Sequence, residues 1–181
     1  MKDLKTLLEA SILDIDDTLS VSSDDLRREA VKKFIKDNYD VAAPGAKISA
    51  KPNKDDKFEV SARGFTRIKP DMRIKKSLTS ITNGDFIWTK VNGGFDISWM
   101  PFLETLEGMP REIGGSLWLN NCPSIKSLDG FPEKVGTNDK GSMIYIGRTG
   151  TPKYFSKNDV IKVCKYPAGG FIDASNYGEL G

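Results

Sequence analysis

The fold of this chain is decided by Leu103-Glu104-Thr105-Leu106-Glu107-Gly108-Met109-Pro110-Arg111-Glu112-Ile113-Gly114 and by a second copy, Ile125-Lys126-Ser127-Leu128-Asp129-Gly130-Phe131-Pro132-Glu133-Lys134-Val135-Gly136. Six aliphatic, glycine and proline positions of the first stretch recur 22 residues later in the second. One such unit cannot bury its own apolar face, so neighbouring units must stack against it. The repeat therefore predicts a chain built from translated copies of one short unit.

Each unit leads into a short segment with alternating aliphatic residues, which predicts a β-strand. These segments are Phe95-Asp96-Ile97, Leu117-Trp118-Leu119 and, after an insertion over 137–141, Ile144-Tyr145-Ile146. A less regular copy, 78–84, precedes them and is followed by an insertion over 83–90. Stacking the units places Phe95, Leu117 and Ile144 in one inward column of a parallel strand ladder.

The same alternation turns the residues between these aliphatic positions toward the open face of the ladder. The candidate partner-binding residues on this face are Asp96, Ser98, Trp118, Asn120 and Tyr145. Aromatic side chains are enriched at binding hot spots, although Trp118 and Tyr145 would also suit packing beneath a neighbouring element. We expect Trp88 and Trp99 to serve packing.

The segments on both sides of the repeat predict caps. Residues 2–13 have helical spacing of leucine and isoleucine, and Ser22-x-x-Asp25 predicts the start of a second helix that ends in 38–45. A β-hairpin follows, with its turn at 52–56 and a third strand from 65–69 and 72–74. Ser156-x-x-Asp159 begins a C-terminal helix, and 171–173 is a final strand.

The predicted fold class is thus α+β, with N-terminal helices and a β-hairpin, a short parallel strand ladder and a C-terminal helical cap. We divide the chain into an N-terminal helical segment (1–40), a hairpin cap (41–76), a ladder (77–150) and a C-terminal cap (151–181).

The composition excludes several classes of function. The chain has 181 residues and no histidine, which excludes Ser-His-Asp catalysis and histidine-ligated metals. Cys122 and Cys164 are the two cysteines, and we expect buried thiols in a reducing compartment. No apolar run reaches the roughly 20 residues that span a bilayer, and residues 1–13 do not form a secretory signal. We expect no metal and no cofactor.

The repeat resembles a known family at these residues. A period of 22 lies within the range of leucine-rich repeats. The pattern Leu-x-x-Leu-x-Gly-x-Pro-x-x-Val/Ile-Gly, together with the leader 7–14 and the ending 155–163, resembles degenerate leucine-rich-repeat proteins encoded by tailed bacteriophages of gut bacteria. This resemblance implies architecture and origin, and the leader is similar to short tags that direct phage proteins into the capsid. It implies a virion component, packaged or decorating.

Two other functions compete with protein binding. Asp14-Ile15-Asp16-Asp17-Thr18 resembles the first motif of haloacid-dehalogenase-type phosphatases, in which Asp14 would be the nucleophile and Asp16 the general acid, the pair holding Mg²⁺. The motif follows a helical pattern and lacks its later partners, so an acidic turn is the simpler interpretation.

A basic segment over 47–76 could instead contact phosphates of a nucleic acid. Its candidate residues are Lys47, Lys51, Lys54, Arg63, Arg67, Lys69 and Arg73. The segment has few aromatic residues to stack on bases, so a solvated hairpin surface is the preferred interpretation.

The sequence therefore predicts a non-catalytic phage protein that acts through protein–protein contacts, located in the virion or in the host cytoplasm. A soluble protein that binds a host factor is the alternative within the same class.

Overall fold

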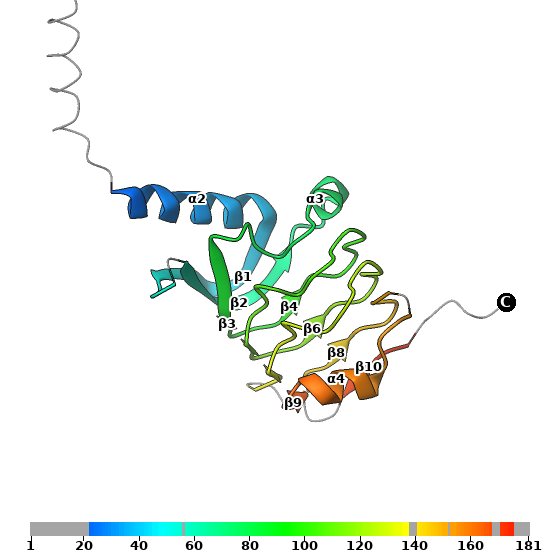
Figure 1. Cartoon of the computed structure of the whole chain (residues 1–181). Coiled ribbons are helices and arrows are strands. Elements are labelled where there is room, and N and C mark those ends of the chain that lie inside the picture. The colour runs from blue at the N-terminus through cyan, green and yellow to red at the C-terminus, as the bar shows by residue number, and fades with distance from the viewer. Residues whose placement is uncertain (1–21, 56, 138–140, 152, 168–170, 176–181) are drawn as a thin grey trace, which may run out of the picture.

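The computed structural model describes residues 22–55, 57–137, 141–151, 153–167 and 171–175. It is an α+β structure with one mostly parallel sheet and a few helices (Figure 1). The elements are α2 (Ser23–Asn38), β1 (Tyr39–Pro52), β2 (Phe58–Ile68), α3 (Met72–Ser77), β3 (Phe86–Val91), β4 (Phe95–Asp96), β5 (Glu112–Ile113), β6 (Leu117–Trp118), β7 (Lys134–Val135), β8 (Ile144–Tyr145), α4 (Lys157–Val163), β9 (Tyr166–Pro167) and β10 (Ile172–Asp173).

The long strand β2 is the first rung of two parallel ladders. Its first half, from Phe58 to Ala62, pairs with β3, and its second half pairs with β4 through Thr66 and Arg67. The sheet order β10-β8-β6-β4-β2-β3-β5-β7-β9 then runs outward from β2 in both directions. We call β2-β4-β6-β8-β10 the first ladder and β2-β3-β5-β7-β9 the second ladder. Each repeat unit thus contributes one short strand to each ladder.

The predicted ladder and its register are confirmed. Phe95 pairs with Leu117, Leu117 with Ile144, and Ile144 with Ile172. All but Ile172 are fully buried, as are Ile97, Leu119 and Ile146 two residues further along each strand. The 22-residue repeat is therefore the spacing between β4 and β6, and the insertion over 137–141 lengthens it to 27 residues between β6 and β8.

A glycine turn ends the loop that returns the chain to the next rung. Gly108 and Gly130 occupy the same repeat position and have φ angles of 86° and 84°. A residue with a Cβ atom is strained at such a positive φ. The repeat therefore requires glycine here.

The helices and the hairpin cap the two ends of the ladders, as predicted (Figure 1). The side chain of Ser22 accepts a hydrogen bond from the backbone N–H of Asp25 at 3.1 Å, which begins α2, and α4 has a capping box between Ser156 and Asp159. Val31 and Ile35 bury α2 against the same hydrophobic core that extends to Val160 of α4. The helix predicted over 2–13 lies outside the described residues.

Two predictions about the strands need correction, and one feature was missed. There is no third hairpin strand over the described residues 65–74, because 65–68 continues β2 and Met72–Ser77 is helix α3, capped by the Asp71 side chain. The stretch 83–90, predicted as an insertion, contains most of β3, since Phe86, Trp88 and Val91 all point into the core. The second ladder was not predicted.

One expected segment boundary falls inside a continuous strand, and another falls inside the ladders. β1 begins at Tyr39, directly after α2, so the division at residue 40 lies within a strand. The ladders continue through β9 and β10, beyond the division at residue 150.

Candidate functional site

The outward residues of the first ladder form a single column. Strand pairing aligns Arg67 of β2 with Asp96, Asp96 with Trp118, Trp118 with Tyr145, and Tyr145 with Asp173. Three of the candidate partner-binding residues, Asp96, Trp118 and Tyr145, are therefore neighbours on successive rungs, as predicted.

The aromatic members of this column stack on one another. The rings of Trp118 and Tyr145 lie 5.6 Å apart at an interplanar angle of 8°, and Phe65 meets Trp118 edge-on at 5.6 Å. A Cβ atom at Gly94 would lie 2.7 Å from Cζ3 of Trp118, so glycine leaves the space that the indole occupies. The Tyr145 hydroxyl donates to Sδ of Met143 at 3.1 Å. The two rings are half-buried and held in one orientation.

A second column stands where each rung of the first ladder ends. Trp99, Asn121 and Arg148 occupy this position, 22 and 27 residues apart. They are the non-glycine residues with positive φ in the described chain, at 63°, 60° and 56°. The backbone N–H groups of Trp99 and Asn121 donate to the next rung, to the carbonyls of Asn120 and Gly147, both at 2.9 Å. We call these three residues the ridge.

The ridge carries backbone strain at two of its three positions. Asparagine tolerates the left-handed region, whereas tryptophan and arginine there cost about 1–2 kcal/mol each. Trp99 was predicted to pack, and this is wrong, because its side chain is 56% exposed. Residues held in such conformations cluster at functional sites. The ridge is therefore a candidate part of the site.

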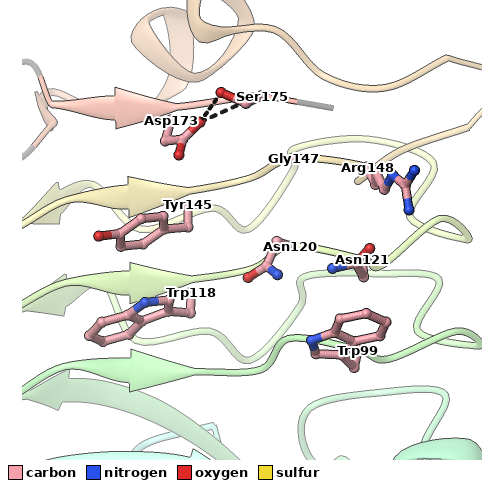
Figure 2. A pocket seen from close by; sticks show the side chains of 9 residues that line it. All are labelled: Trp99, Trp118, Asn120, Asn121, Tyr145, Gly147, Arg148, Asp173 and Ser175. Carbon is pink, nitrogen blue, oxygen red and sulfur yellow. Dashed lines mark hydrogen bonds between the residues drawn. The ribbon is translucent and has the colours of Figure 1, made fainter. Parts of the chain in front are cut away.

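A groove of about 480 Å³ runs between the column and the ridge. Trp118, Tyr145 and Asp173 line one side, the ridge lines the other, and Asn120, Gly147 and Ser175 lie between them (Figure 2). The groove crosses successive rungs of the first ladder.

Asn120 presents hydrogen-bond donors in this groove. Its Oδ1 accepts from the Ser98 hydroxyl at 2.8 Å, and among the described residues its amide N–H₂ has no hydrogen-bond partner. Ser98 itself is 4% exposed, and its carbonyl accepts from Nζ of the buried Lys75 at 2.5 Å. Asp96 accepts from the Ser98 backbone N–H at 2.9 Å. Ser98 thus supports Asn120 from below, and the prediction that it contacts a partner directly is corrected.

A second hollow, of about 370 Å³, adjoins the opposite side of the ridge. We call it the far hollow. It is lined by Met72, Lys76, Trp99, Pro101, Asn121, Pro123, Arg148 and Tyr154. Met72 and Tyr154 are among the exposed large hydrophobic residues. The groove, the ridge and the far hollow together form one continuous surface.

The ridge was not predicted from the sequence, although the spacing of its residues follows the repeat. The offsets of 22 and 27 residues that align Phe95, Leu117 and Ile144 also align Trp99, Asn121 and Arg148. Asp173 and Ser175 were missed because no clear repeat precedes β10.

The basic candidates are spread over the hairpin, its turn and α3. Lys47 pairs across the hairpin with Arg63, Lys51 with Glu59, and Lys54 lies in the turn. Three others have protein partners: Arg67 contacts Asp40 at 3.3 Å, Arg73 contacts Asp71 at 2.8 Å, and Lys69 donates to the carbonyl of Lys36 at 2.6 Å. Arg67 alone joins the outward column.

Few other candidate catalytic or metal-binding groups lie in the described part of the chain. Asp14 and Asp16 lie outside it. Across the described ranges no cluster of three cysteine or carboxylate side chains could hold a metal ion, and none of the helices there is long and apolar enough to cross a membrane. Cys122 and Cys164 are buried cysteines, as predicted, and burial raises the pKa of the Cys122 thiol to about 12.

No protein-family model matches this chain, and no curated protein and no solved structure matches it.

Proposed function

We propose that this chain is a non-catalytic binding protein of a tailed bacteriophage, built as a short leucine-rich-repeat-like stack that holds a protein partner on its first-ladder face. The observation that carries the proposal is the gathering of Trp99, Trp118 and Tyr145 around one groove, continuous with Met72 and Tyr154 in the far hollow.

The residue types of this face favour a protein partner. Tryptophan, tyrosine, methionine and arginine are enriched in protein interfaces, and the largest contributions to binding come from such residues. A continuous exposed apolar patch on a small protein marks an interaction site more often than chance exposure does. The rings of Trp118 and Tyr145 are stacked and half-buried, so part of each ring stays open to a partner.

A crosslinking experiment tests the face. A photoreactive phenylalanine derivative is placed at Trp99 or, as the control, at Ile161 of α4, whose exposed fraction of 48% is close to the 56% of Trp99. In phage-infected cells, position 99 should crosslink one defined protein, position 161 should not, and Trp118→Ala should abolish the crosslink. Equal crosslinking at both positions would contradict the proposal.

The sequence resemblance supports the phage origin and the place in the virion. Mass spectrometry of purified particles of a phage that encodes the chain should find it in stoichiometric amount, together with the crosslinked partner. A chain absent from the particles, with a crosslinked partner from the bacterium, would identify it instead as a protein that binds a host factor.

A further inference from the structure

The far hollow combines apolar walls with positive charge. Its apolar side chains come from Met72, Trp99 and Tyr154 and from two prolines. Among the residues that the structure describes, its charged lining residues are Lys76 and Arg148, and no carboxylate lines it. Asp173 lines the groove, which lies on the other side of the ridge.

The ridge separates the two cavities and lines both of them. Its side chains reach this position through a left-handed backbone that tryptophan and arginine adopt at a cost. The middle rung carries asparagine, which suits the conformation, so the fold accepts a less strained residue at the same repeat position. The left-handed conformation therefore does not itself select tryptophan or arginine at the two outer rungs.

From these observations we infer that the far hollow binds a segment of the partner in which an aspartate or glutamate flanks an apolar side chain. The apolar side chain packs between Trp99, Met72 and Tyr154, and the carboxylate accepts hydrogen bonds from Arg148 and Lys76. Charge-assisted hydrogen bonds from a guanidinium to a carboxylate are among the strongest in proteins. This inference rests on the proposed function and names the chemistry of the partner.

Selection from a random library of displayed short peptides, on the immobilised full chain, tests the inference. The enriched peptides should share an acidic residue next to an apolar one. Their affinity should fall at least about tenfold in the double variant Lys76→Gln, Arg148→Asn, because such a loss corresponds to one charge-assisted hydrogen bond. Raising the salt concentration should weaken binding to the wild-type chain.

Matched controls separate recognition from folding. Arg63→Asn removes an exposed arginine of the hairpin, and Phe171→Asn removes an aromatic side chain that is 57% exposed, close to the 56% of Trp99. Neither should change the affinity more than about twofold. Trp99→Asn and Arg148→Asn should leave the melting temperature unchanged or raise it by about 2–4 °C, because each relieves strain equivalent to that shift. If the melting temperature instead fell by a comparable amount in both variants, the ridge would serve the fold, and the inference would be overturned.

The outcomes distinguish this inference from the proposed function. Peptides that lose affinity in Trp118→Ala, yet tolerate the Lys76 and Arg148 double variant, would leave the face in place and overturn its preference for acidic segments. A library that yields no binding peptide, with binding to a glycan array instead, would overturn both.

Discussion

The two ladders share one repeat and differ in what they present to solvent. In the first ladder, the outward column consists of Arg67, Asp96, Trp118, Tyr145 and Asp173. In the second ladder, the outward residues Lys90, Glu112 and Lys134 pair rung by rung. Nζ of Lys90 lies 2.7 Å from Oε1 of Glu112. One face therefore gathers aromatic rings beside a groove, while the other alternates opposite charges that satisfy one another.

This difference separates two roles of the repeat. The inward residues of both ladders are equally buried, since Ile113, Val135, Leu117 and Ile144 are all fully covered. The inward positions thus hold the stack together on both sides, and the outward positions distinguish the proposed binding face from the face of the second ladder.

The largest expected effect comes from the shared core. Leu117→Ala in the first ladder and Ile113→Ala in the second should each lower the free energy of unfolding by about 2–5 kcal/mol, because each leaves a cavity at a fully buried position. Chemical denaturation followed by circular dichroism should show one transition in both variants. Two separate transitions would mean that the ladders unfold independently.

A smaller effect should be confined to the first ladder. A Cβ atom at Gly147 would lie 2.1 Å from the carbonyl oxygen of Ser175, so Gly147→Ala must displace β10 from β8 at a cost of about 1–3 kcal/mol. Amide hydrogen exchange should speed up at Ile144 and Ile146, whose N–H groups donate to Phe171 and Asp173. Gly136 of the second ladder, whose N–H donates to Ile113, serves as the reference and should keep its protection.

The ridge should respond to residue type at its middle rung. Asn121→Ala should lower the free energy of unfolding by about 1 kcal/mol, because alanine adopts the positive φ of 60° less readily than asparagine does. Asn121→Gly should cost less than Asn121→Ala, which a comparison of melting temperatures would reveal. The reverse order would show that the asparagine side chain, and not its backbone, stabilises the turn.

The smallest effect should come from the charges of the second ladder. The hydrogen bond from Lys90 lowers the pKa of Glu112 below its ordinary value of 4.5. A carboxyl whose pKa is lowered in the folded state stabilises the fold at pH values above its ordinary pKa. This contribution disappears as the pH falls through the pKa of the folded state. Glu112→Gln should therefore lower the free energy of unfolding by about 0.2–1 kcal/mol at neutral pH and leave it unchanged in acid. Denaturation curves at neutral pH and well below pH 4.5 check this, and an unchanged difference between them would contradict it.

Much of the first ladder was predictable from the sequence because its evidence is local and repeated. The 22-residue offset predicted the pairing of Phe95 with Leu117, and alternation predicted that Trp118 and Tyr145 face outward. Alternation did not predict the second ladder, because a glycine directly follows Ile113 and Val135. In the first ladder a second aliphatic residue, such as Ile97 or Leu119, continues each segment. The helix α3 was missed for a related reason, because Met72–Ser77 is too short for a helical period to outweigh its neighbouring strand.

The sequence by itself determined that similar units stack, which side chains enter the core and which rings point away from it, because burial and alternation depend on residues close together in the chain. Only the tertiary structure decided that the aligned residues Trp99, Asn121 and Arg148 adopt a left-handed backbone. It alone also decided that Ser98 lies beneath Asn120 and that Met72 and Tyr154 complete the far hollow. These contacts join segments from separate rungs and caps, and their geometry depends on how the whole stack closes.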